Sequence, residues 1–148
     1  MTTITIYTIG FTNKSAQRFF DLLSAHRVQR LIDTRLNNSS QLAGFAKGKD
    51  LAFFAGKICG CEYVHNLLLA PSKEILEDYR NKKITWEQYE QKYLSLLKER
   101  AIEKQIDFNK LHQSCFLCSE HLPERCHRRL LVEYIKPFHS GIEIVHLK

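Results

Sequence analysis

The amino-acid sequence predicts a single-domain α/β fold with a mostly parallel sheet of about five strands and helices on both faces. Two observations predict this class. Short apolar runs rich in β-branched residues alternate along the chain with segments whose apolar residues recur at helical spacing. The chain has 148 residues, 44% of them hydrophobic, which is enough for one buried core. One domain is therefore expected over residues 1–148.

The first half of the chain has the pattern of two strand–helix pairs. A strand over Ile4–Ile9 ends at Gly10, and a helix with a capping Ser15 follows. A second strand is expected over Arg30–Arg35, followed by a polar loop and a helix over about Lys49–Ile58. Three further strands are expected at residues 62–65, 114–118 and 142–146.

Residues 66–109 form a stretch too long for one crossover, so the sequence predicts a helical insertion that could act as a lid. A helix is expected over Ser72–Tyr79. A second helix begins at Thr85, where Thr85-Trp86-Glu87-Gln88 fits a capping box. The aromatic residues on one face of this second helix have the spacing of core packing, which we favour over a nucleobase platform.

The composition limits the classes of function. A net charge of +6 favours anionic, phosphate-bearing partners, although Lys and Arg are too scattered for a dedicated nucleic-acid binder. No run of about 18 apolar residues and no secretory signal is present, so we expect no membrane segment and a cytoplasmic location. Four of the five cysteines lie in segments that look buried, which favours reduced thiols over a disulfide framework.

Polar or small residues follow the end of each of the first four predicted strands. The set comprises Gly10, Asp33, Arg35, His65, Cys118 and Glu120. In a parallel sheet these residues share one edge, and open α/β sheets bind ligands outside the carboxyl ends of their strands. The sequence therefore predicts a pocket at this edge.

The segment Cys118–Arg129 carries most of the chemically active side chains, in a predicted strand-to-helix turn. Pro123 and Glu124 suit the first positions of a helix, whose free N–H groups would lie near residues 125–127. Such a helix start, with Arg125 or Arg128, holds a phosphate or carboxylate. Arg35 either reaches the same anion or forms a buried ion pair with Asp33 or Glu120.

Three kinds of chemistry are considered at this turn. Glu120 is the favoured general acid or base, with His127 or His65 transferring a second proton. Cys118 or Cys126 becomes a nucleophile if a guanidinium group stabilises its thiolate, although a cysteine that ends a buried strand is typically a small core residue.

A zinc ion is the third possibility, bound by Cys115, Cys118, Cys126 and either His121 or His127. Residues three apart in a strand point to opposite faces, which argues against Cys115 and Cys118 sharing an ion. We therefore predict no metal site, and the sequence identifies no cofactor.

The chain resembles the bacterial domain-of-unknown-function family 488. The resemblance rests on Thr8-Ile9-Gly10, Asp33-Thr34-Arg35, Tyr63-Val64-His65 and Cys118-x-Glu120-x2-Pro123-x2-Cys126-His127-Arg128. It implies a compact α/β domain with a site built from Arg35, Glu120, Cys126, His127 and Arg128. Two positions depart from the family pattern: Phe11 stands where members often carry a histidine, and Asn38 where they often carry a proline.

The leading hypothesis from the sequence is a hydrolase or transferase that acts on a nucleotide, a nucleobase or a nucleic-acid end. The predicted catalytic residues are Glu120, His127 and Cys126. The predicted ligand-binding residues are Gly10, Asp33, Arg35, His65, Cys118, Arg125 and Arg128. The alternatives are a nucleic-acid-binding module without catalysis and a thiol-based sensor or redox enzyme that uses Cys118 and Cys126.

Overall fold

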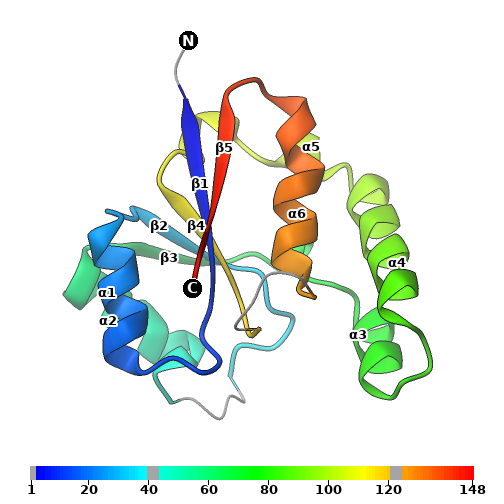
Figure 1. Cartoon of the computed structure of the whole chain (residues 1–148), viewed down its shortest axis with the longest axis horizontal. Coiled ribbons are helices and arrows are strands. Elements are labelled where there is room, and N and C mark those ends of the chain that lie inside the picture. Colours follow the sequence, from blue (N-terminus) through cyan, green and yellow to red (C-terminus); the bar gives the residue numbers. More distant parts are fainter. Residues whose placement is uncertain (1–2, 40–43, 121–124) are drawn as a thin grey trace.

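The computed structural model describes residues 3–39, 44–120 and 125–148 (Figure 1). Within these residues five strands form one sheet in the order β3-β2-β4-β1-β5, and all neighbouring pairs are parallel. The strands are β1 (Ile4–Gly10), β2 (Arg30–Asp33), β3 (Glu62–His65), β4 (Ser114–Cys118) and β5 (Ile142–Leu147). The predicted α/β class and parallel sheet are confirmed.

Helices alternate with the strands. The α-helices are α1 (Ala16–Ala25), α2 (Gly48–Cys59), α3 (Lys73–Arg80), α4 (Trp86–Glu99), α5 (Ile102–Gln105) and α6 (His127–Ile135). Short 3-10 helices occupy Gly44–Ala46, Leu67–Leu69, Phe108–Lys110 and Lys136–Phe138. None of the helices in the described ranges is long and apolar enough to cross a membrane.

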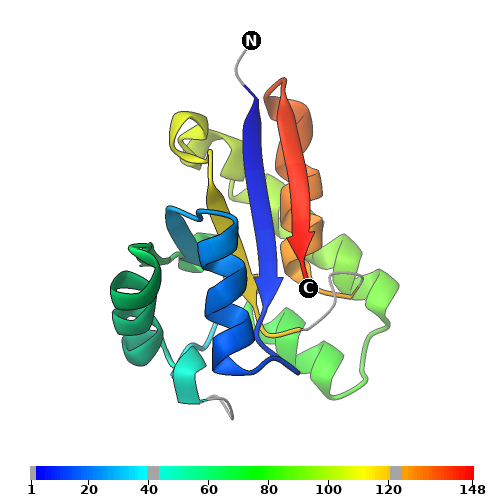
Figure 2. The same cartoon turned by 60° about the vertical axis from the view of Figure 1, so that its left-hand side comes forward.

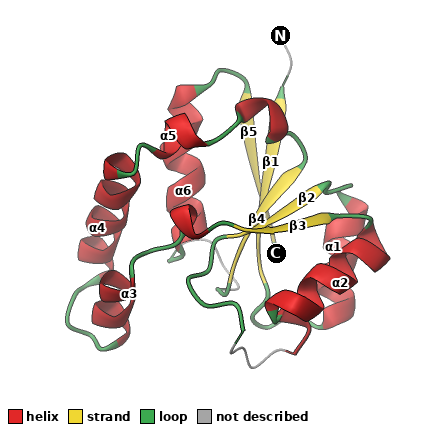
Figure 3. Ribbon diagram, turned by 180° about the vertical axis from the view of Figure 1, so that it is seen from behind, coloured by secondary structure: helices red, strands yellow, loops and turns green. Residues whose placement is uncertain are grey.

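The sheet is covered on both faces, as the sequence predicts (Figures 1 and 3). On one face α1 and α2 pack over the sheet, and Phe19, Leu23 and Leu51 are buried there. On the other face lie α3, α4, α5 and α6, with Tyr93 and Leu131 in a second core. The sheet thus separates two apolar layers, so its middle strands β2, β4 and β1 are buried from both sides.

Local sequence signals account for the starts of α1 and α4. The Ser15 side chain accepts a hydrogen bond from the backbone of Arg18, which caps α1. Thr85 and Gln88 form the predicted capping box at the start of α4. The aromatic face of α4 packs into the second core, as Tyr89 and Tyr93 are buried. Core packing, favoured from the spacing, is therefore confirmed for these two residues.

The strand order creates a switch point between β1 and β4. The chain leaves β1 through α1 and continues to β2 and then to β3 at one edge of the sheet. It leaves β4 through α6, on the opposite face, and continues to β5 at the other edge. In open α/β sheets such a reversal leaves a crevice between the two strands at their carboxyl ends. The sequence did not specify this order.

Candidate functional site

The predicted strand-end residues lie at one edge of the sheet. Gly10, Asp33, His65 and Cys118 are the last residues of β1, β2, β3 and β4. The parallel register aligns Gly10 with Cys118 and Asp33 with His65. Figure 2 shows β1 and β4 running to the same end of the molecule. Gly10 and Cys118 are thus neighbours at the switch point between β1 and β4.

A buried ion pair occupies the end of β2. Arg35 Nη2 lies 2.7 Å from Asp33 Oδ2, and Arg35 Nε donates to Asp33 Oδ1 at 2.9 Å. Asp33 is fully buried and Arg35 is 3% exposed. A two-nitrogen fork on one carboxylate is the strongest geometry for such a pair. Pairing of Arg35 with Asp33, one of the alternatives from the sequence, is therefore present.

Two side chains from β3 complete this ion-pair network, which comprises Asp33, Arg35, Tyr63 and His65. The Tyr63 hydroxyl donates to Asp33 Oδ2, and His65 Nε2 donates to the Arg35 carbonyl at 2.7 Å. Burial and the hydrogen bond to Asp33 raise the pKa of Tyr63 to about 12, so its hydroxyl keeps its proton at neutral pH. The network therefore fixes the edge between β2 and β3.

The ion-pair network also shortens β2. The sequence predicts a strand over Arg30–Arg35, but the strand ends at Asp33. Beyond that residue the Arg35 backbone N–H donates to Asp33 Oδ1 at 3.1 Å instead of to a neighbouring strand. The Asp33 side chain therefore competes with the sheet for backbone hydrogen bonds, which is typical of aspartate.

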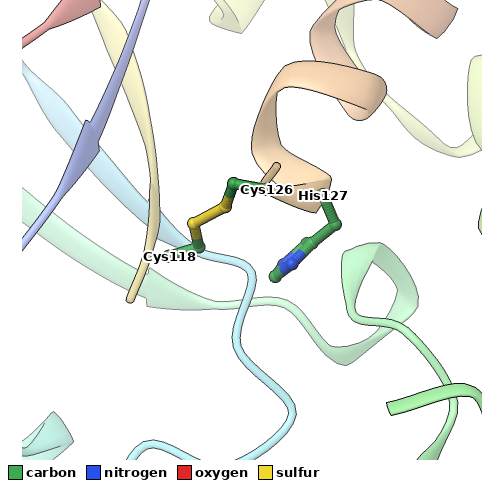
Figure 4. A group of neighbouring side chains, drawn as sticks. All are labelled: Cys118, Cys126 and His127. Carbon is green, nitrogen blue, oxygen red and sulfur yellow. A yellow bond between two sulfur atoms is a disulfide. The ribbon is translucent and has the colours of Figure 1, made fainter. Parts of the chain in front are cut away.

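A second group, the sulfur cluster, lies beside the network and comprises Cys118, Cys126, His127 and Arg128. A disulfide joins Cys118 at the end of β4 to Cys126, the residue before α6 (Figure 4). The expectation of reduced thiols is wrong for this pair, because Cys126 at the start of α6 lies beside the end of β4. Cys59, Cys61 and Cys115 are free.

Arg128 is the charged member of the sulfur cluster. It is fully buried, and its Nη1 lies 3.1 Å from Cys118 Sγ while also donating to the Glu120 carbonyl. Gly10 makes this arrangement possible. A Cβ at Gly10 would overlap the Glu120 carbonyl and lie 2.8 Å from Arg128 Nη1. The absence of a side chain at Gly10 therefore allows the loop after β4 to approach β1.

His127 is held by Thr34, the middle residue of the Asp-x-Arg motif. His127 Nε2 lies 2.9 Å from the Thr34 carbonyl oxygen and 2.9 Å from its hydroxyl. A carbonyl can only accept, so we assign the proton to Nε2, which leaves the lone pair on Nδ1. Burial lowers the pKa of His127 to about 4, so the ring is neutral at pH 7.

Two cysteines outside the disulfide, Cys61 and Cys115, and the nearby Lys14 have shifted pKa values. Burial raises the pKa of Cys61 to about 12 and holds that of Cys115 well above its ordinary value. Neither thiol is therefore nucleophilic at neutral pH. Burial and the nearby Arg128 lower the pKa of Lys14, in the loop after β1, to about 8.

A family model, described as Domain of unknown function DUF488, matches residues 15–135. The chain belongs to this family. The match includes both the ion-pair network and the sulfur cluster. No curated protein and no solved structure matches the chain at a significant level.

Two predicted site residues of this DUF488 chain are exposed. The Glu120 side chain is exposed, and only its backbone carbonyl joins the sulfur cluster. Arg125 is also exposed and precedes α6, which begins at His127 and not at the predicted residues 123–124. Those two positions, together with His121, lie outside the described residues.

Thr34 is the site residue that sequence reasoning missed. It is buried, and its hydroxyl donates to the Leu117 carbonyl at 2.8 Å, so it links β2, β4 and His127. Its place inside the Asp33-Thr34-Arg35 motif was the available signal.

A cavity of about 650 Å³ elsewhere, between α1 and α2, is lined mainly by apolar residues such as Phe20, Phe45 and Phe54. No predicted site residue lines it.

Proposed function

We propose that the protein is a thiol-based redox protein in which Cys118 and Cys126 interconvert between two thiols and a disulfide. The disulfide at the switch point of the sheet, with Arg128 Nη1 3.1 Å from Cys118 Sγ, carries this proposal. A guanidinium group beside sulfur stabilises the thiolate, which is the reactive form. Cys118 is therefore the attacking thiol and Cys126 the resolving one.

The oxidation we propose uses a small peroxide. The Cys118 thiolate attacks one peroxide oxygen, so an S–O bond forms, the O–O bond breaks and hydroxide leaves. The Cys126 thiol then attacks this sulfur, forming the S–S bond and releasing the oxygen as water. Overall, two thiols and one hydrogen peroxide give one disulfide and two waters.

Burial of the sulfurs supports small reactants. Cys118 is 1% exposed and Cys126 is 2% exposed, so a bulky protein partner does not reach either sulfur without local opening. A small dithiol is the reductant we propose. It forms a mixed disulfide and then its own cyclic disulfide, returning both cysteines to thiols. This cycle suits a reducing compartment such as the cytoplasm, which is the location we expect from the sequence.

Thiol counting tests the proposal directly. The reduced protein is treated with increasing hydrogen peroxide, denatured, and labelled with a maleimide that adds mass at each free thiol. Of the five cysteines, two are expected to become unreactive together and to recover with dithiothreitol. Cys118→Ser and Cys126→Ser should each lose this paired step, whereas the matched control Cys59→Ser should retain it.

The same thiol count can also contradict the redox proposal. If all five thiols remain labelled in the wild type at every peroxide concentration, Cys118 and Cys126 do not form a redox pair. Circular dichroism of each variant establishes that it is folded. If both Ser variants unfold, peptide mapping of the oxidised wild type identifies the linked cysteines.

The phosphate-directed enzyme predicted from the sequence is a second candidate function. Arg35 Nη1 favours it, since this buried nitrogen meets no hydrogen-bond acceptor among the described residues. Lys14 adds positive charge at the same edge. An anion supplied by a nucleotide could accept from Arg35 Nη1 without breaking the bonds to Asp33.

A thermal-shift screen with nucleotides and inorganic phosphate tests this candidate. A ligand at about 100 times its dissociation constant stabilises the native state by roughly 2.7 kcal/mol. The gain should disappear in Arg35→Lys, which keeps the charge but loses the fork, and persist in Arg30→Ala at the opposite end of β2. Stabilisation by oligonucleotides alone, lost at higher salt, would instead favour a non-catalytic binding module.

A further inference from the structure

We infer that the reduced sulfur cluster binds one zinc-type divalent ion through the two thiolates of Cys118 and Cys126 and the imidazole of His127. The ligand atoms of these three residues lie within 4.8 Å of one another. The inference rests on the proposed function, because only the reduced pair offers two thiolates to an ion. Figure 4 shows the three side chains converging from the end of β4 and the start of α6.

The donor set is typical of zinc. Thiolate and imidazole are its preferred ligands, and two sulfurs with one nitrogen supply three of the four tetrahedral positions. Binding releases two protons, one from each thiol. Three protein ligands leave one position open, which is the arrangement of zinc sites that accept water or a small ligand.

The groups around the cluster are placed as outer-shell partners of an ion. His127 donates its Nε2 proton to the Thr34 carbonyl at 2.9 Å. The lone pair on Nδ1 would therefore bind the ion. Metal-ligating histidines generally donate their other ring N–H in this way, and the bond fixes the ring orientation. Arg128 Nη1, 3.1 Å from Cys118 Sγ, would donate to a metal-bound sulfur.

The backbone spacing of the two cysteines provides an independent argument. Their Cα atoms lie 7.4 Å apart. Most disulfides span about 4.4–6.8 Å between Cα atoms, so these backbone positions are further apart than a disulfide requires. Two thiolates that share an ion accommodate a wider separation, since the ion lies between the sulfurs.

Cys115 and Cys118, the pair judged unable to share an ion from the strand geometry, are not both ligands of this site. Cys115 belongs to the core beneath α1 and α2, on the opposite face from α6, and is therefore no candidate for the fourth ligand. Cys126 and His127, which belonged to the same predicted ligand set, remain beside Cys118 because they are adjacent at the start of α6. Among the residues that the structure describes, Cys118, Cys126 and His127 are the one group of thiol, imidazole or carboxylate side chains placed closely enough to share an ion.

Metal binding and disulfide formation exclude each other at this cluster. One hydrogen peroxide and two protons convert the zinc dithiolate into the disulfide, a free zinc ion and two waters. The two electrons leave the sulfurs and reduce the peroxide oxygens, while zinc stays divalent. Oxidation would therefore release the ion, and zinc would protect the thiols against peroxide.

Cobalt(II) is the probe, because thiolate-to-cobalt charge transfer absorbs in the near ultraviolet and reports the number of bound sulfurs. The full chain is reduced, freed of reductant without oxygen and titrated with cobalt. We expect one cobalt per chain, displaced by zinc, and no binding to the peroxide-oxidised protein. Cys118→Ser and Cys126→Ser should each show about half of the charge-transfer intensity.

His127→Gln separates the imidazole from the sulfurs. It should retain the charge-transfer bands but bind cobalt at least about tenfold more weakly, since even outer-shell partners are worth 10- to 100-fold in affinity. Cys59→Ser, the matched control, should titrate like the wild type. Charge-transfer bands of full intensity in Cys126→Ser, or none in the reduced wild type, would overturn the inferred site.

The two proposals fail in different ways. If thiol counting shows a reversible pair but the reduced wild type binds no cobalt, the metal site is wrong and the redox function stands. If cobalt binds with two thiolates but peroxide never links Cys118 to Cys126, the redox function is wrong and the ion site stands.

Discussion

The ion-pair network and the sulfur cluster occupy the same edge of the sheet, and each surrounds a buried arginine, but the two arginines face different groups. Both nitrogens of the Arg35 fork donate to the Asp33 carboxylate. Arg128 Nη1 faces Cys118 Sγ and a backbone carbonyl. In the redox cycle that we propose, the charge of that sulfur changes between the thiolate and the disulfide. One edge of the sheet thus carries a buried ion pair beside the cysteine pair to which we assign the redox chemistry.

The largest effect should come from removing the carboxylate of the buried ion pair. Asp33→Ala leaves the Arg35 guanidinium buried without its carboxylate, and breaking a buried pair in this way costs about 3–5 kcal/mol of unfolding free energy. Urea denaturation measures the loss. The matched control is Glu62→Ala, which breaks the exposed pair with Arg30 and should cost at most about 1 kcal/mol.

The difference in unfolding free energy between Asp33→Ala and Glu62→Ala tests whether the ion-pair network anchors this edge of the sheet. If Asp33→Ala and Glu62→Ala cost the same, the ion-pair network is not an anchor. The Asp33→Ala/Arg35→Met double variant, in which no buried charge is left unpaired, should recover most of the lost stability.

Gly10→Ala tests the close approach that connects the two strands at the switch point. The added Cβ would overlap the Glu120 carbonyl, a backbone atom that cannot rotate away. We expect a loss of about 3 kcal/mol, at the upper end of overpacking effects, together with slower reaction of Cys118. Gly56→Ala, where a Cβ meets nothing within 4 Å, should instead stabilise α2 by about 0.5–1 kcal/mol. Equal effects at both glycines would contradict the role given to Gly10.

Local patterns in the sequence determined the elements but not their order. Ser15 and Thr85 marked helix starts correctly, because a cap depends on residues only three positions away. The parallel arrangement then placed Gly10 and Cys118 at one edge. That β4 lies between β1 and β2 depends on packing between distant segments, which no local pattern encodes.

The sequence predicted which residues form the candidate site better than it predicted the contacts between those residues. The Asp33–Arg35 pair was among the alternatives drawn from the sequence, since the two residues belong to one motif. The Cys118–Cys126 bond was not, because it depends on the path of the chain between β4 and α6. The contact between Thr34 and His127 joins residues 93 positions apart through a backbone carbonyl, an atom that every residue has. Residue identity therefore carries no signal for the carbonyl contact, and only the contact of the Thr34 hydroxyl depends on the residue type.

Arg128→Met asks whether the guanidinium favours the reduced pair. A hydrogen bond to a charged group is worth about 2 kcal/mol, and for a two-electron couple this corresponds to roughly 40 mV. The reduction potential of the Cys118–Cys126 pair should therefore become more negative by about that amount, measured in glutathione redox buffers. Arg128→Lys, which keeps a charge, should shift it less. A potential unchanged in Arg128→Met would mean that the contact with Cys118 has no electrostatic consequence.

The smallest expected effect is at Tyr63, on the border of the ion-pair network. Tyr63→Phe removes the hydroxyl that donates to Asp33 Oδ2, but Arg35 Nη2 continues to bind this oxygen. Because no charge is left unpaired, we expect a loss of only about 1 kcal/mol in urea denaturation. Tyr134→Phe, which removes the hydrogen bond to Glu103 on the other face, serves as the matched control and should cost less. The potential of the Cys118–Cys126 pair should not change in Tyr63→Phe, since Tyr63 contacts Asp33 and not the sulfurs. A clear shift would instead mean that the ion-pair network and the sulfur cluster act as one electrostatic unit, coupled through Thr34.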